Sequence, residues 1–177
     1  VDIPAATSHG VPVVYTPGAN SRAVAEAAIT FMLALCKRAL YFDRQLKLGN
    51  WESRHGAAPG DLAGATLGII GFGNIGRTLA ELARPFNMTV IAYDPHVPRE
   101  TMEELGVEMA TLDDLLARSD FISVHAPLTD QTRGLINAEK LKLVRPGTYL
   151  VNLARGGLVE SLDALYDAME DGRLAAV

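Results

Sequence analysis

The chain has 177 residues, 49% of them hydrophobic, which is enough for one core and too little for two full domains. Its formal net charge of −5 provides no basic surface, so duplex nucleic acid and anionic membranes are poor candidates as partners. Charges interrupt every apolar run before it could cross a bilayer, and a single cysteine excludes a disulfide framework and favours a reducing, cytoplasmic setting.

Residues 1–19 look like the end of another domain. The sequence V-P-V-V-Y-T, within residues 10–16, predicts a short strand that ends at Pro17 and has no earlier strand to pair with. Asn20 or Ser21 then caps a predicted helix that runs to about Leu48. The apolar side of this helix is formed by Ala25, Ala28, Ile29, Met32, Leu33, Cys36 and Leu40. So long a stripe predicts packing on the sheet and on a second subunit, and we therefore expect a homodimer through the helix from Asn20 to Leu48.

The segment from Gly49 to Ala65 has no regular period and is predicted to be a connection. Trp51 is expected to pack where this connection folds back. Cys36 lies within the apolar helical pattern with no base near it in sequence, so it is interpreted as a buried structural thiol.

The most informative motif follows a predicted strand at residues 67–70. Gly71, Gly73 and Gly76 fit G-x-G-x-x-G, and a helical pattern begins directly after them. In this motif the first glycine permits a tight turn and the second lets the backbone approach a pyrophosphate. The third lets the helix and the strand pack closely. The sequence therefore predicts a dinucleotide site at this turn.

The flanking elements support this prediction. The amides of Asn74 and Ile75 open a predicted helix whose positive end faces the phosphates. A second strand, at residues 90–93, delivers Asp94 about twenty residues after the turn, where a carboxylate can bond a ribose 2′-hydroxyl. This favours NAD, although Arg99 is near enough in sequence that NADP stays an alternative. The alternative for Asp94 is a solvated turn residue before Pro95.

The rest of the chain alternates between helices and strands. Helices are predicted at 100–105, 112–118, 138–143 and 161–170, and strands at 107–110, 121–124 and 149–153, with one further strand starting near Ala175. This alternation implies right-handed crossovers and an α/β fold with a doubly wound parallel (Rossmann) sheet. Ligands of such sheets bind beyond the carboxyl ends of the strands, which singles out the turns at 71–76, 125–129 and 154–157.

Four segments also match a known family. They are P-G-A-N at 17–20 with A-V-A-E at 23–26, G-I-I-G-F-G-N-I-G at 68–76, H-A-P-L-T at 125–129 and V-N-L-A-R-G-G at 151–157. In this order they resemble the D-isomer-specific 2-hydroxyacid dehydrogenases, in particular the phosphoglycerate and the hydroxypyruvate or glyoxylate branch. The resemblance implies hydride exchange between NAD and a small 2-hydroxy or 2-keto acid.

The resemblance also implies roles for single residues. Arg155 matches the arginine that holds the substrate carboxylate and carbonyl oxygen, a task that suits a guanidinium fork; the alternative is a surface arginine in a Gly-rich turn. His125 is expected to contact the cofactor or to pack, rather than to carry a proton. The expected cofactor-binding residues are Gly71, Gly73, Asn74, Ile75, Gly76, Asp94, His125, Pro127, Thr132, Leu153 and Ala154. Asn20 and Ser21 are candidates for binding the pyrophosphate or the substrate anion, with plain helix capping as the alternative. No histidine pair has metal-ligand spacing, so no metal is expected.

The sequence departs from the family pattern because it covers only part of the expected length. The family's glutamate and proton-carrying histidine are expected beyond Val177. Residues 20–177 are then a Rossmann domain truncated before its last strands, and residues 1–19 a remnant strand and linker of the substrate domain. Such a chain is expected to bind cofactor without turning over substrate, and the particular 2-hydroxy acid stays open. The alternative function is an NAD(H)-sensing, corepressor-type binding protein of the same fold.

Overall fold

The fold is described from a computed structural model, which describes residues 1–56 and 59–177. Six strands form one sheet in the order β3-β2-β1-β4-β5-β6, and every neighbouring pair is parallel. Their bounds are β1 Thr66–Ile70, β2 Thr89–Tyr93, β3 Glu108–Met109, β4 Phe121–Val124, β5 Thr148–Asn152 and β6 Leu174–Ala176. The predicted doubly wound sheet is confirmed, and its strand order reverses between β1 and β4, where such sheets bind nucleotides.

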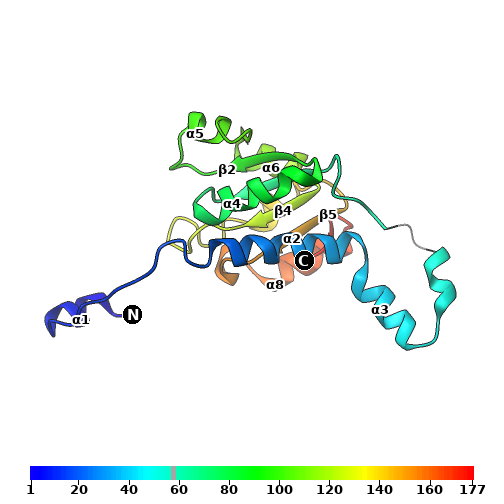
Figure 1. The fold of residues 1–177 in the computed structure, drawn as a ribbon, viewed down its shortest axis with the longest axis horizontal. Coiled ribbons are helices and arrows are strands. Elements are labelled where there is room, and N and C mark those ends of the chain that lie inside the picture. The colour runs from blue at the N-terminus through cyan, green and yellow to red at the C-terminus, as the bar shows by residue number, and fades with distance from the viewer. Residues whose placement is uncertain (57–58) are drawn as a thin grey trace.

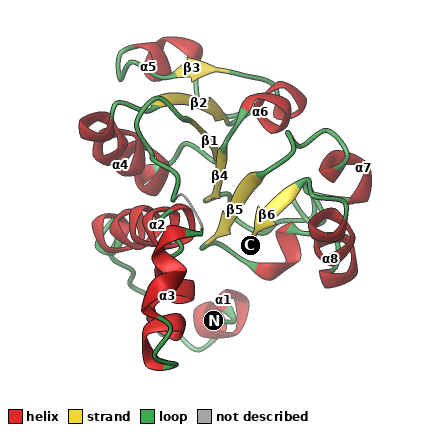
Figure 2. Ribbon diagram, turned by 90° about the vertical axis from the view of Figure 1, so that its right-hand side faces the viewer, coloured by secondary structure: helices red, strands yellow, loops and turns green. Residues whose placement is uncertain are grey.

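Helices cover both faces of the sheet (Figures 1 and 2). Figure 2 shows α2 and α4 on one face and α6, α7 and α8 on the other. The bounds of the α-helices are α1 Ile3–Ser8, α2 Ser21–Cys36, α3 Ala39–Lys47, α4 Asn74–Ala83, α5 Arg99–Glu103, α6 Leu112–Arg118, α7 Ala138–Leu141 and α8 Leu162–Glu170. Short 3-10 turns lie at Trp51–His55, Arg84–Phe86 and Gly156–Leu158. None of these helices is both long and apolar enough to span a membrane.

The core has two apolar layers, one on each face of the sheet. Leu67 and Ile69 of β1 pack toward α2 and α4, whereas Ile70 belongs to the layer on the opposite face. This alternation follows from the two-residue period of a strand. Each fully buried side chain of this size contributes about 1.5–3 kcal/mol, so the two layers fix the strand ends that carry the functional turns.

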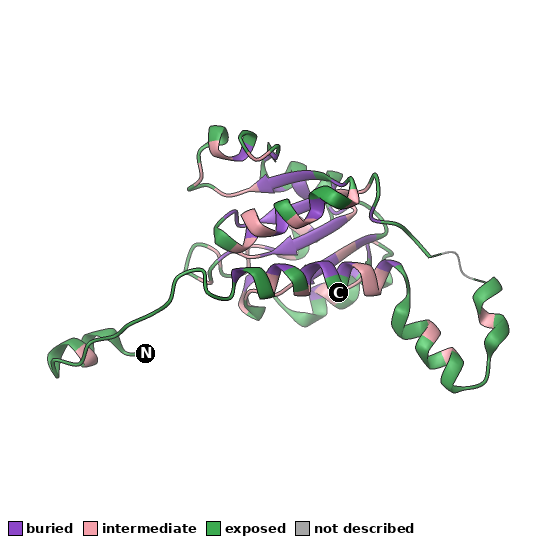
Figure 3. Ribbon diagram, viewed as in Figure 1, coloured by how far each residue is buried: buried purple, intermediate pink, exposed green. Residues whose placement is uncertain are grey.

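The predicted strand within residues 10–16 is wrong. Residues 11–16 form no regular secondary structure, and the chain before them forms α1 instead. Asp2 caps α1 by accepting a hydrogen bond from the Ala5 amide at 2.9 Å. No described strand pairs with residues 11–16, and Val14 and Tyr15 are 86% and 79% exposed. In Figures 1 and 3 this segment extends away from the body of the protein and is exposed along most of its length. A short run of β-branched and aromatic residues needs a partner strand before it forms part of a sheet.

The prediction of a single helix running to about Leu48 is also wrong, because α2 ends at Cys36 and α3 begins at Ala39. Arg38, between them, is in the left-handed region with φ 52°, and α3 turns away from the body (Figure 1). The Gly60 amide donates a 2.9 Å hydrogen bond to the Cys36 carbonyl, so the returning connection satisfies a carbonyl at the end of α2.

Two side chains expected in the interior lie on the surface as a consequence of this break. Leu40 does not continue the buried stripe of α2 and is 77% exposed. Trp51 is 53% exposed rather than packed into a fold of the connection, and the guanidinium of Arg54 lies over its ring, 4.7 Å from the centroid. Cys36 is buried, as expected.

Candidate functional site

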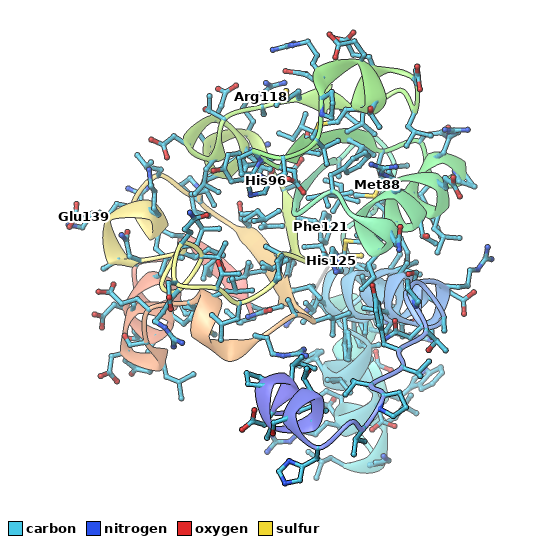
Figure 4. The ribbon with its side chains drawn as sticks, turned by 90° about the vertical axis from the view of Figure 1, so that its left-hand side faces the viewer. Met88, His96, Arg118, Phe121, His125 and Glu139 are labelled. Atoms are coloured by element: carbon cyan, nitrogen blue, oxygen red, sulfur yellow. The ribbon has the colours of Figure 1, made fainter. Side chains whose placement is uncertain are left out.

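The three turns singled out by the sequence meet at the carboxyl edge of the sheet. They follow β1, β4 and β5, which are neighbours in the sheet. Figure 4 looks onto this edge, with His96 on the turn after β2 and His125 at the end of β4. The candidate site is therefore assembled from turns that are far apart in sequence and held by buried strands.

The turn at residues 71–76 after β1, called the glycine bend below, is tightly packed at two of its three glycines and open at the third. Gly71 has φ +95°, and a Cβ there would lie 2.6 Å from the Ala126 amide nitrogen. A Cβ on Gly76 would lie 2.4 Å from the Gly71 carbonyl oxygen. A Cβ on Gly73 would meet no atom within 4 Å. Packing within the protein thus explains Gly71 and Gly76, while the open space over Gly73, at the start of α4, fits the diphosphate of a dinucleotide.

Asp94 holds the bend in place. Its Oδ2 accepts a hydrogen bond from the Phe72 amide at 2.8 Å, and its Oδ1 accepts one from the His96 amide at 2.9 Å. Arg77 adds a hydrogen bond from Nε to the Phe72 carbonyl at 3.2 Å. Asp94 is therefore more than a solvated turn residue. Since each carboxylate oxygen has a second lone pair, Asp94 can still accept from ribose hydroxyls.

A cavity of about 520 Å³ opens beside Asp94. It is lined by Gly71, by residues 93–96 and by the turn after β4, which includes Pro127 and Thr132. The Thr132 hydroxyl donates to the Pro127 carbonyl at 2.6 Å and accepts from the Thr129 amide at 2.8 Å. Thr132 therefore shapes the wall, with its hydroxyl used inside the turn. Asp130 and Gln131 also line this cavity and were missed, because in sequence they look like an ordinary polar turn.

A second cavity, of about 480 Å³, joins the three turns. The expected residues that line it are Ile75, His125, Pro127, Leu153, Ala154 and Arg155. Asn20 and Val24, at the start of α2, complete the wall. Ile75 lies within the glycine bend, so Arg155 is on the same edge of the sheet as the bend.

The turn that carries Arg155 is stabilised by Asn152. The Asn152 Oδ1 accepts from the Ala154 amide at 3.0 Å, and its Nδ2 donates to the Arg155 carbonyl at 3.1 Å. The Arg155 guanidinium is exposed and donates from Nη1 to the Ala154 carbonyl at 2.8 Å. Within the described residues no carboxylate pairs with it, so the guanidinium is available to an anion.

His125 is partly buried, and its Nδ1 atom is fully covered and has no hydrogen-bond partner in the described part of the chain. Its Nε2 lies 2.8 Å from the hydroxyl of the buried Ser123. Burial lowers the pKa of His125 to about 4, so the ring is neutral at neutral pH. A ring this weakly basic is a poor proton carrier, which favours contact with the cofactor or packing.

The structure describes no grouping of three or more His, Cys, Asp or Glu side chains that could hold a metal ion in residues 1–56 and 59–177. The histidines outside the edge are exposed: His9 follows the end of α1, and His55 ends the 3-10 turn that begins at Trp51.

Comparisons with known proteins agree with this geometry. Residues 29–177 match the sequence model of the family "D-isomer specific 2-hydroxyacid dehydrogenase, NAD binding domain". The D-3-phosphoglycerate dehydrogenase of Archaeoglobus fulgidus is 42% identical over 99% of this chain and 33% of its own length. The hydroxypyruvate reductase of Thermotoga maritima is 44% identical over 99% of this chain and 56% of its own length. The chain thus spans about a third of the first relative and about half of the second.

A solved structure shows the same arrangement. The D-lactate dehydrogenase of Aquifex aeolicus, complexed with NAD and lactic acid, superposes with a TM-score of 0.88 at 36% identity. The match covers 99% of this chain and 52% of the other.

Proposed function

This chain belongs to the D-isomer-specific 2-hydroxyacid dehydrogenase family as its NAD-binding domain, and we propose on that premise that the protein transfers a hydride between NAD and a D-2-hydroxy or 2-keto acid. The observation that carries the proposal is the placement of Arg155. Arg155, which has no carboxylate partner among the described residues, shares a cavity and a sheet edge with the glycine bend, so a substrate anion would lie beside the bound cofactor.

Residues at the carboxyl edge of the sheet are proposed to bind different parts of NAD. The open space over Gly73 and the start of α4 take the diphosphate, and Asp94 takes the ribose of the adenosine. Leu153 and Ala154 line the cavity for the reactive ring. When it is bound, the nicotinamide ring of NAD would accept the hydride, or donate it in the reverse reaction.

Arg155 and a proton carrier complete the proposed chemistry. The Arg155 fork binds the substrate carboxylate and stabilises the negative charge that develops on the C2 oxygen. The low pKa of His125 and its bond to Ser123 argue against it as the proton carrier. We therefore propose that the proton carrier is a group other than His125.

The substrate is proposed to be of the phosphoglycerate, hydroxypyruvate or glyoxylate type, because the relatives named above are a phosphoglycerate dehydrogenase and a hydroxypyruvate reductase. These relatives are named as enzymes, so they give no support to a corepressor-type binding protein.

A homodimer through α2 and α3 is also proposed. Large apolar side chains remain exposed on these helices and just after them, at Phe31, Leu40, Tyr41, Leu46 and Leu48. An exposed apolar surface of this kind is typical of a protein interface. Sedimentation of a monomer at micromolar concentration would contradict this assignment.

The experiment that tests the activity is steady-state reduction of glyoxylate and hydroxypyruvate by NADH in the full-length protein. Arg155→Lys keeps the charge and loses the bidentate fork, and kcat/KM should fall about a hundredfold or more. Arg84→Lys is the matched control, because Arg84 is exposed and donates to the Leu105 carbonyl away from both cavities. Equal losses in the two variants would contradict the role of Arg155.

A further inference from the structure

Asn152 is the last residue of β5 and lies three positions before Arg155. Its backbone is fixed by the sheet, where it pairs with Val124 of β4. It is not among the described residues that line the two cavities at the carboxyl edge. Any effect of Asn152 on a bound substrate would therefore act through the turn that follows β5.

The carboxamide of Asn152 joins both ends of the dipeptide Ala154–Arg155. Its Oδ1 accepts from the Ala154 amide at 3.0 Å, which closes an Asx turn, and its Nδ2 donates to the Arg155 carbonyl at 3.1 Å. The Arg155 carbonyl also accepts from the Leu158 amide at 3.2 Å, across the 3-10 turn that follows. The backbone is thus held by hydrogen bonds on both sides of the peptide between Ala154 and Arg155.

This peptide in turn directs the guanidinium. The Arg155 Nη1 donates to the Ala154 carbonyl at 2.8 Å, and within residues 1–56 and 59–177 this is the one hydrogen bond that the guanidinium makes. The direction of the Ala154 carbonyl therefore sets the direction of the guanidinium. The other N–H donors of Arg155 stay available to a substrate anion.

Asparagine suits this position because its short side chain offers a donor and an acceptor together. Aspartate would keep the acceptor and lose the donor. Serine can close the equivalent turn through its hydroxyl, more weakly, and alanine can make neither bond. Substitutions at this one residue thus remove the two hydrogen bonds in steps.

We propose that Asn152 is a positioning residue that aligns the Arg155 guanidinium with the substrate. This rests on the proposed function, in which Arg155 binds the substrate carboxylate and stabilises the charge on the C2 oxygen. A bidentate fork needs two donors aligned with two oxygens, so a displacement of about 1 Å weakens it strongly in the transition state. The proposed diphosphate and adenosine contacts lie on other turns, so binding of NADH depends much less on Asn152.

The test is steady-state reduction of glyoxylate by NADH in the full-length protein. In Asn152→Ala, kcat/KM should fall about tenfold to a hundredfold, while the Kd for NADH changes by less than about threefold. Asn152→Ser keeps the bond to the Ala154 amide and should lose less. It also carries the test if Asn152→Ala does not fold.

A double-mutant cycle with Arg155→Lys separates positioning from a general loss of stability. Because the fork is already absent in Arg155→Lys, a further change at Asn152 should lower kcat/KM by no more than about threefold in that background. Asn137→Ala is the matched control. Asn137 is also partly buried, caps α7 by accepting from the Lys140 amide at 2.9 Å, and is not among the described residues lining either cavity. Its loss should lower the melting temperature and leave kcat/KM within about twofold of the wild-type value.

Wild-type kcat/KM in the Asn152 variants would overturn the proposal. Equal fold losses in the wild-type and Arg155→Lys backgrounds would also overturn it, because Asn152 would then act independently of Arg155. A loss in Asn137→Ala as large as that in Asn152→Ala would do the same by pointing to stability alone. Failure of the proposed function is distinguishable from all three, since the wild-type protein itself would then reduce neither glyoxylate nor hydroxypyruvate.

Discussion

The substitution Gly73→Ala separates cofactor binding from folding. Gly73 has φ −76°, which alanine adopts readily, and its Cβ would meet no protein atom within 4 Å. Replacing glycine at a compatible position stabilises a protein by about 0.4–1 kcal/mol, because the unfolded chain loses freedom. Gly73 is also the N-cap residue of α4, where alanine is less favourable than glycine by a similar amount, so the two effects offset each other. The melting temperature should therefore stay within about 3 °C of the wild-type value.

The same methyl group should weaken NADH binding, because it occupies the space assigned to the diphosphate. Misfit of an added methyl costs about 1–3 kcal/mol, which is roughly a fivefold to 150-fold increase in Kd. The assay is a fluorescence titration with NADH, paired with thermal unfolding of the same sample.

Gly76→Ala serves as the contrast for this prediction. Its Cβ would lie 2.4 Å from the Gly71 carbonyl oxygen and 3.2 Å from the Ile69 Cγ2, so it should lower the melting temperature as well as the affinity. Wild-type affinity in Gly73→Ala would refute the placement of the diphosphate. A loss of stability like that of Gly76→Ala would refute the claim that the space is open.

Two further predictions concern the polar groups of the edge. Asp94→Ala removes the acceptor of the buried Phe72 amide, which should cost about 1–3 kcal/mol in the free energy of unfolding and strongly weaken NADH binding; equal wild-type affinities for NADH and NADPH would show that the acid is misassigned. His125 has its pKa lowered to about 4 in the folded state, against about 6.5 in an unfolded chain, so the unfolded state binds the extra proton and stability falls as the pH drops from 6.5 to 4. Urea unfolding should show a loss of up to about 3 kcal/mol over that window that is absent in His125→Asn, and equal pH dependence in the two proteins would contradict the buried neutral ring.

The sequence was informative where structure is local. The predicted strand at 121–124 and helix at 112–118 match β4 and α6, because Thr111 caps α6 and a run of apolar residues forms β4. The carboxyl-edge rule brought together the three turns that line one cavity, because parallel strands joined by right-handed crossovers all present their carboxyl ends on one side.

The sequence was uninformative where a distant residue decides the structure. At the break after Cys36 the Cys36 carbonyl accepts from the amide of Gly60, which lies beyond α3, and arginine at position 38 gives no sign of a left-handed conformation. The strand predicted within residues 10–16 lacks a partner among the described strands. The bonds from Asp94 to two amides and from His125 to Ser123 depend on side-chain directions, which spacing alone does not specify.

The central claim is that the nucleotide lies along the carboxyl edge, from Asp94 across Gly73 to Ala154. Amide chemical shifts of this chain, followed by NMR during titration with NADH, test it directly. We expect saturable shifts at Gly73, Ile75, Asp94 and Ala154 with one common Kd. Shifts confined to another surface, such as the groove between α7 and α8 lined by Leu141 and Ala164, would contradict it.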